Sequence, residues 1–140
     1  MVDAIDLTVP AEIGALDAVH DSIHAFSRRH ELAPRTSYTL ELVVDEFMTN
    51  VVEHGYEGLE PGPVSLRVAM VDGVIQGEIA DEGHAFDPTA APEPDITSDV
   101  AERAVGGLGV HLSRHLLDSL DYRRAGIRNI VRFRLTPQPT

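Results

Sequence analysis

The sequence contains no cysteine, no uninterrupted apolar run of membrane-spanning length and no excess of positive charge. Without cysteine the chain can form neither disulfides nor thiolate zinc sites, and catalysis by a thiol is excluded. A membrane helix needs about 20 consecutive apolar residues, and the first six residues, MVDAID, are acidic where a signal peptide would be basic. We therefore expect a cytoplasmic protein that does not enter a membrane.

The charge balance narrows the classes of partner. The chain carries 23 Asp and Glu against 11 Lys and Arg, a formal net charge of −12. General binding to nucleic acid or to an anionic membrane needs clustered basic side chains, so we expect neither partner. A nucleotide remains compatible, because backbone amides, helix N-termini and magnesium can hold phosphates. Arginines crowd residues 123–134, which suggests a protein partner or, more ordinarily, a solvated strand surface.

Hydrophobic periodicity predicts an α+β fold in a single domain, residues 1–140. Alternation predicts a strand over residues 4–9, a hairpin of residues 64–70 and 74–80 around the turn Asp72-Gly73, and a second hairpin of residues 121–124 and 129–135 around Ala125-Gly126. Apolar residues at three- and four-residue steps predict one helix from Ile13 to Arg29, a second that ends at Gly55, and a third after Gly109. In the second helix we expect Pro34 to mark the break before it and Thr36 or Ser37 to be the N-cap.

The second of these helices carries two stripes of side chains. Its apolar stripe consists of Leu40, Val44, Phe47 and Val51. Glu46, Asn50 and His54 form a polar stripe beside it, which places them at the edge of the core, where a cleft would lie. A carboxylate can take a proton and a carboxamide oxygen can ligate magnesium, which needs only one or two protein ligands. On this motif alone, a solvated helix flank is the simpler interpretation.

Two further motifs follow the second helix. The first motif is Asp81-Glu82-Gly83, at the end of a core strand. Its carboxylate could accept a hydrogen bond from an exocyclic amine such as that of adenine. The alternative interpretation is an Asx turn that closes the strand. Residues 105–109, Val-Gly-Gly-Leu-Gly, form a glycine loop that leads into a helix, which is a potential anion site. Residues 89–102, rich in Pro and acidic side chains, are expected to be a mobile segment over the site.

Two histidine pairs have the spacing of metal ligands on a helix, but other features argue against a metal site. His20 and His24 have no third ligand candidate nearby, and at His111 and His115 Leu112 stands where a zinc protease would have its Glu. Surface histidines are the simpler interpretation of both pairs.

Taken in order, the three motifs resemble the N, G1 and G2 boxes of the GHKL ATP-binding superfamily, which includes gyrase, Hsp90, histidine kinases and MutL. They are Glu46-x-x-x-Asn50, Asp81-x-Gly83 with Phe86-Asp87-Pro88, and Gly106-Gly107-x-Gly109 at the head of a helix. More narrowly, nearly the whole chain resembles the small single-domain anti-sigma factor serine kinases of the RsbW and SpoIIAB type. The resemblance implies a two-layer α/β sandwich of the Bergerat type, with a mixed, mostly antiparallel sheet and helices on one face.

The resemblance also implies a role for each motif residue. Asn50 matches the magnesium ligand of the N box, Glu46 matches the general base one turn earlier, and His54 lies near the phosphates. Asp81 matches the aspartate that binds the adenine amine, with Gly83 beneath the base. The remaining ATP-binding positions are Phe86 in the G1 box, Arg103 in the lid, and Gly106, Gly107, Leu108 and Gly109 in the G2 box.

The function implied by the resemblance is that of an anti-sigma factor and ATP-dependent serine/threonine kinase that uses ATP and Mg²⁺. Because no phospho-acceptor helix pair precedes the domain, its substrate is expected on another protein, a STAS-domain anti-anti-sigma factor, with a sigma factor as second partner and a homodimer also compatible. The alternative is a nucleotide-dependent module that binds a regulator with little or no phosphotransfer. The presence of both Glu46 and Asn50 favours the kinase.

Overall fold

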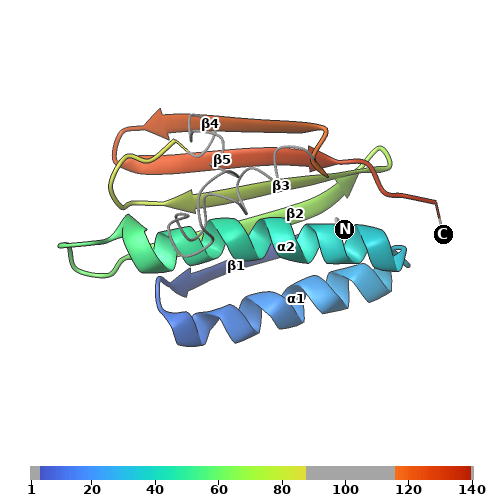
Figure 1. Cartoon of the computed structure of the whole chain (residues 1–140), viewed down its shortest axis with the longest axis horizontal. Helices are drawn as coiled ribbons and strands as arrows, with labels where there is room; N and C mark the ends of the chain where they lie inside the picture. The colour runs from blue at the N-terminus through green and yellow to red at the C-terminus, as the bar shows by residue number, and fades with distance from the viewer. Residues whose placement is uncertain (1–3, 88–115, 140) are drawn as a thin grey trace, which may run out of the picture.

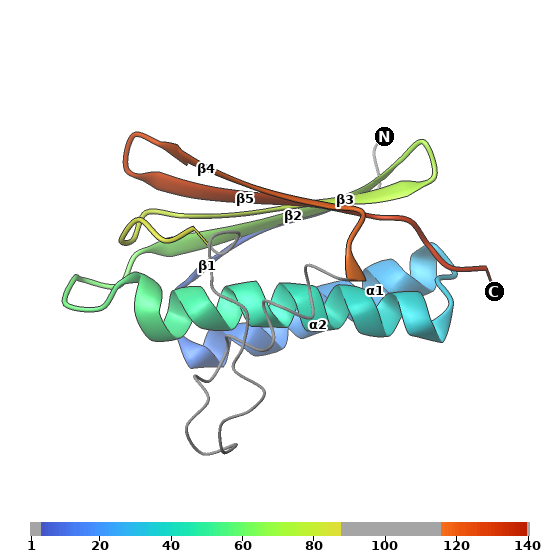
Figure 2. The ribbon, with the colours of Figure 1, turned by 45° about the horizontal axis from the view of Figure 1, so that its top comes forward.

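The computed structural model describes residues 4–87 and 116–139. In this part of the chain, two helices pack on one face of a five-stranded sheet (Figures 1 and 2). The elements are β1 (Ala4–Pro10), the 3₁₀ turn η1 (Ile13–Ala15), α1 (Leu16–Arg29), α2 (Pro34–Asn50), the π-helical turn η2 (Val51–Gly55), β2 (Pro63–Val71), β3 (Val74–Asp81), β4 (Ser119–Ala125) and β5 (Arg128–Leu135). The predicted two-layer α+β architecture is confirmed. None of the helices among the described residues is long and apolar enough to span a membrane.

The sheet has the strand order β1-β2-β3-β5-β4, and every pairing between the described strands is antiparallel. The β2–β3 hairpin turns at Asp72-Gly73 as predicted, and both residues have positive φ angles, 51° and 80°, as a type I′ turn requires. The β4–β5 hairpin turns at residues 126 and 127, one position later than predicted, because Ala125 is still paired with Arg128.

The core fills the space between the helices and the inner face of the sheet. From α1, Val19, Ile23 and Phe26 are fully buried, whereas Ile13 is 73% exposed. The prediction that Ile13 belongs to the apolar stripe is wrong, because residues 13–15 form a separate 3₁₀ turn that ends before the helical phase begins. On the sheet side, the ring of Phe133 lies so close to Gly77 that a Cβ there would be 2.1 Å from it.

The start of α2 differs from the prediction. The helix begins at Pro34 itself, which is tolerated in the first turn because the N–H that proline lacks would have no helical partner there. No side chain caps this end, so the predicted N-caps Thr36 and Ser37 are wrong. Both lie inside the helix and serve tertiary contacts: the Thr36 hydroxyl accepts a hydrogen bond from the backbone N–H of Gln138 at 2.8 Å, and the Ser37 hydroxyl donates to that of Ser27 at 2.9 Å.

The histidines of α1 join the two helices. His20 Nε2 lies 2.9 Å from Asp45 Oδ1, and His24 Nε2 lies 3.2 Å from Glu41 Oε2. The i, i+4 spacing therefore places both rings opposite carboxylates on α2. The second histidine pair, at positions 111 and 115, lies outside the described residues.

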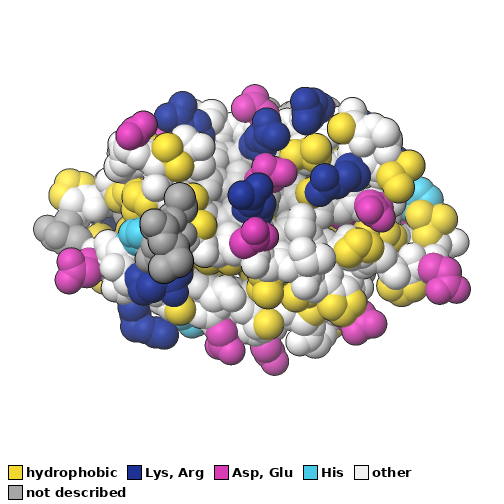
Figure 3. All heavy atoms as spheres, turned by 180° about the vertical axis from the view of Figure 1, so that it is seen from behind, with side chains coloured by type: hydrophobic (Ala, Val, Ile, Leu, Met, Phe, Trp, Pro, Cys, Tyr) yellow, Lys and Arg dark blue, Asp and Glu magenta, His cyan; other side chains and the backbone are white. Residues whose placement is uncertain are grey.

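The face of the sheet away from α1 and α2 carries a row of charges that crosses all five strands (Figure 3). The strand register places side by side, in this order, Asp6, Arg67, Glu78, Arg132 and Asp121. Signs alternate along this charge row, and Arg132 Nε lies 3.5 Å from Glu78 Oε2. Arginines 123, 128 and 134 alternate onto the same face, so the solvated strand surface considered from the sequence accounts for most of the C-terminal arginines.

Candidate functional site

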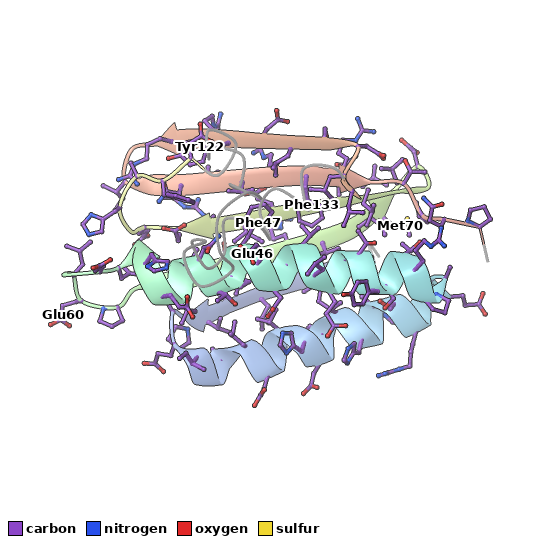
Figure 4. All side chains as sticks on the ribbon, viewed as in Figure 1. Glu46, Phe47, Glu60, Met70, Tyr122 and Phe133 are labelled. Atoms are coloured by element: carbon purple, nitrogen blue, oxygen red, sulfur yellow. The ribbon has the colours of Figure 1, made fainter. Side chains whose placement is uncertain are left out.

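A cavity of about 520 Å³ lies between the helix layer and the sheet, a volume in the range of small-molecule and cofactor sites. Segments from the end of α2, from η2, from β3 and the loop after it, and from β5 meet here. The lining residues are Phe47, Asn50, Val51, His54, Gly55, Glu57, Ile79, Asp81, His84, Ala85, Phe86, Asn129 and Val131. Figure 4 shows Phe47 on the side of α2 that faces the sheet. The wall is mostly apolar, with a few polar groups that could fix the orientation of a ligand.

Asp81, the last residue of β3, is the buried carboxylate of this cavity and is 7% exposed. Its Oδ1 accepts a hydrogen bond from the Gly83 N–H at 2.8 Å and another from Asn129 Nδ2 at 3.0 Å. Because both bonds end on Oδ1, the second oxygen, Oδ2, takes part in neither. A buried carboxylate needs donors, and an N–H group on a ligand would suit this oxygen.

Gly83 allows the loop after β3 to lie directly against η2. A Cβ on Gly83 would be 2.1 Å from the carbonyl oxygen of Gly55, a distance that atoms cannot adopt. The same carbonyl accepts a hydrogen bond from the backbone N–H of His84 at 2.7 Å, and His84 Nε2 donates to the Glu57 carbonyl at 2.6 Å. The family resemblance placed Gly83 beneath the base, and in the structure the close neighbour of Gly83 is the chain's own backbone at Gly55.

The helix side of the cavity is formed where α2 continues into the π-helical turn η2. Asn50, the last residue of α2, and His54, within η2, both line the cavity. Short π-helical segments inside helices are rare and are frequent at functional sites. The sequence periodicity did not reveal this turn, because the stripe of residues at four-residue steps looks the same for an uninterrupted α-helix.

Glu46 lies on α2, one turn before Asn50 (Figure 4). It is not among the residues that line the cavity. Its side chain is partly buried, and Oε1 has no hydrogen-bond partner among the described residues. Burial, followed by repulsion from Asp45 and Glu53, raises the pKa of Glu46 above its ordinary value, while a hydrogen bond from the Asn50 side chain acts in the opposite direction. The Asn50 side chain therefore interacts with Glu46, and a carboxylate with a raised pKa is suited to act as a general base.

Of the other predicted site residues, the structure describes only Phe86. Phe86 lines the cavity and is 53% exposed. Outside the described residues lie Arg103, Gly106, Gly107, Leu108 and Gly109, together with the predicted mobile segment and the helix after it.

Asn129 is a residue of the cavity that the sequence did not single out. It lies on β5 opposite Asp81 and is 3% exposed. The sequence does contain a signal for this residue: strand alternation places Asn129 on the same face as Val131 and Phe133, both of which are buried, so a polar side chain occupies an inward-facing position. Another unforeseen contact comes from β4, where Arg124 Nη1 donates to the Gly83 carbonyl at 2.9 Å.

Comparison with known proteins identifies relatives of this chain. Residues 9–135 match the family described as histidine kinase-like ATPase domain. The serine/threonine-protein kinase BtrW of Bordetella bronchiseptica is 32% identical over 122 residues, which are 87% of this chain and 84% of the relative. The serine-protein kinase RsbW of Bacillus pumilus is 28% identical over 126 residues, 86% of this chain and 78% of the relative.

A solved structure has the same fold. In the crystal structure of the RsbU and RsbW domains of Rv1364c from Mycobacterium tuberculosis, the similar region covers 99% of this chain and 34% of the solved chain, with a TM-score of 0.72. The sequence identity is 16%, so this likeness concerns the fold alone.

Proposed function

The chain belongs to the histidine kinase-like ATPase family, in the group that contains the protein kinases BtrW and RsbW, and from this premise we propose that it transfers the γ-phosphate of ATP to a serine or threonine of a partner protein. The observation that carries the proposal is the Asp81 carboxylate, buried in a cavity of nucleotide size with one oxygen left for a ligand. This oxygen would accept a hydrogen bond from the exocyclic amine of adenine, and the apolar wall would contact the faces of the base.

The triphosphate would extend toward the end of α2. The described lining of the cavity contains Asn50 and His54 but neither Lys nor Arg, and the chain as a whole has no lysine. The carboxamide oxygen of Asn50 would help to hold a magnesium ion bound with the nucleotide, because this hard cation takes only one or two protein ligands, and the ion would supply positive charge that offsets the charge of the phosphates. The glycines at positions 106, 107 and 109 and Arg103 remain proposed phosphate contacts on the strength of the family pattern.

Glu46 is the proposed general base. Its raised pKa and its hydrogen bond with Asn50 support this role, because the bond would keep the carboxylate near the triphosphate. It would take the proton from the attacking hydroxyl of the partner, which phosphoryl transfer needs in addition to positioning and charge stabilisation.

The proposed partners follow from the type of relative. We propose that the phosphorylated protein is a STAS-domain anti-anti-sigma factor and that a sigma factor competes for the same kinase, which would place the protein in the cytoplasm. A homodimer is compatible with these roles.

One observation favours a second candidate, a nucleotide-dependent module that holds a regulator without phosphotransfer. Glu46 lies outside the cavity lining, and a raised pKa also favours the protonated form, which cannot accept a proton.

Labelled ATP with a STAS-domain partner separates the two candidates. If the protein is a kinase, we expect the partner to become labelled. Glu46→Gln should then lower the transfer rate by about 10²- to 10⁴-fold and leave the affinity for ATP nearly unchanged. Asp81→Asn should lose ATP binding itself. Glu41→Gln is the matched control on the same helix, because this carboxylate faces His24. Normal transfer by Glu46→Gln would remove the base from the proposal. Wild-type protein that retains the partner and ATP but transfers nothing is the binding module, and failure to bind ATP would refute both.

A further inference from the structure

Asn129 is a buried amide in the cavity wall, and we propose that it sets the selectivity of the site for adenine over guanine by occupying one oxygen of Asp81. Tyr122 on the neighbouring strand is proposed to hold the amide in its orientation. This inference rests on the proposed function, because it assumes that a purine nucleotide binds in the cavity.

The hydrogen bonds of Asn129 use its full capacity. Its Nδ2 donates to Asp81 Oδ1 at 3.0 Å and to the His84 carbonyl at 2.7 Å. Its Oδ1 accepts from the Tyr122 hydroxyl at 2.6 Å and, over a longer 3.4 Å, from the Phe86 N–H. A carboxamide has two N–H donors and two acceptor lone pairs, so none is left for a ligand. Asn129 is therefore a positioning residue that acts through Asp81, although it lines the cavity.

The partners also determine which way the amide points. A carboxylate and a carbonyl, which only accept, face the nitrogen, whereas a hydroxyl and an N–H face the oxygen. Rotation of the amide by 180° would place its oxygen against Asp81 and its nitrogen against the Phe86 N–H. The Asp81 carboxylate, the His84 carbonyl and the Phe86 N–H oppose this rotation, because each can act only as acceptor or only as donor. The Tyr122 hydroxyl holds the amide in place with the shortest of the four bonds, and Tyr122 does not itself line the cavity.

The consequence for Asp81 is that it offers a ligand a single acceptor. Oδ1 already receives the Gly83 N–H and the Asn129 amide, so only Oδ2 is available. Adenine presents one suitable donor, its exocyclic N6 amine. Guanine presents two adjacent donors, N1–H and the N2 amine, which match both oxygens of a free carboxylate in a bidentate pair. The occupied Oδ1 prevents that pairing, and guanine placed as adenine would bring its O6 acceptor against Oδ2.

The ratio of GTP to ATP dissociation constants, measured by calorimetry with magnesium present, tests the proposal. Asn129→Leu keeps the approximate size and removes one of the two donors on Oδ1, which leaves this oxygen able to accept one bond from a ligand. It should lower the ratio by about 10- to 100-fold, the effect of one hydrogen bond to a charged group. Tyr122→Phe should lower it by about two- to tenfold, the effect of a neutral hydrogen bond. The control is Tyr38→Phe, which removes a hydroxyl from an exposed side chain outside the cavity lining and should leave the ratio unchanged.

The outcomes distinguish this inference from the proposed function. If Asn129→Leu and Tyr122→Phe weaken both nucleotides equally, the network only supports the fold and the inference is refuted, while the proposed function stands. If Asn129→Leu does not fold, Tyr122→Phe on the sheet edge decides, because it retains the ring and its ratio must still fall. Wild-type protein that binds neither nucleotide would refute the proposed function together with this inference.

Discussion

Replacing Gly83 with alanine tests whether the loop after β3 must lie against η2 for the site to exist. The added Cβ would be 2.1 Å from the Gly55 carbonyl oxygen and 2.6 Å from its carbon. Both are backbone atoms, so no side-chain rotation can relieve the overlap, and the loop must move away from η2.

The movement breaks two hydrogen bonds, and their loss sets the expected decrease in the free energy of unfolding. The His84 N–H loses the Gly55 carbonyl, and the Gly83 N–H loses Asp81. The first is a neutral hydrogen bond of about 0.5–1.5 kcal/mol and the second, to a carboxylate, is worth about 1.5–3 kcal/mol. We therefore expect Gly83→Ala to lower the free energy of unfolding by about 2–4 kcal/mol, which for a domain of this size lowers Tm by roughly 5–15 °C.

Two other glycines provide matched controls for this experiment. Alanine at Gly14 meets nothing within 4 Å and should leave both Tm and nucleotide binding unchanged. Alanine at Gly77 would be 2.1 Å from the Phe133 ring, so it should lower Tm while the folded protein still binds ATP. Thermal unfolding and an ATP titration below each Tm measure both effects. Gly83→Ala should be the one variant of the three that loses stability and ATP binding together. The reasoning is refuted if Gly83→Ala has the Tm and ATP affinity of the wild type.

Three further predictions concern stability. The raised pKa of Glu46 means that the folded state favours the protonated form, so the carboxyl destabilises the fold as the pH rises through its folded pKa. Glu46→Gln should therefore have a higher Tm than the wild type at pH 7 and the same Tm below pH 4.5, the ordinary pKa of this group. An equal gain in Tm at all pH values would contradict this. Thr36→Val removes the acceptor of the Gln138 N–H and should lower the free energy of unfolding, measured by denaturant titration, by about 1 kcal/mol. An unchanged free energy would show that this hydrogen bond does not contribute to stability. A double-mutant cycle of Glu78→Ala and Arg132→Ala should give a coupling of about 0.2–1 kcal/mol that falls in high salt, whereas a salt-independent coupling would speak against an exposed ion pair.

Local signals in the sequence were enough to predict most of the fold. The Asp72-Gly73 turn and the apolar stripe of α2 depend on neighbours within a few residues. The turn occurs where it was predicted, and Leu40, Val44 and Phe47 of the stripe are buried, whereas Val51 lies in η2 and is partly buried. The start of α2 was predicted wrongly because a hydroxyl near a helix start indicates a cap only if no distant group uses it. Gln138 uses that of Thr36 from 102 residues away along the chain.

The candidate site could be predicted only in part. Asp81 stood out because it ends a strand and precedes a glycine, whereas Asn129 comes beside it only through the register of β3 and β5, 48 residues further along the chain. Sequence periodicity also had no means of indicating that Gly83 would contact Gly55, since that contact depends on the π-helical turn at the end of α2. Distant pairing and an irregular helical turn account for what was missed.

The charge row across the sheet makes the molecule electrically two-sided. Among the described residues, the strands expose five arginines (67, 123, 128, 132 and 134) beside three carboxylates (6, 78 and 121) on that side, although the chain as a whole carries an excess of twelve negative charges. The anionic surplus is therefore concentrated elsewhere on the molecule. The field of the protein will orient a charged partner as it diffuses toward contact, so a basic partner will arrive at a different side from an acidic one, and added salt will weaken this orientation.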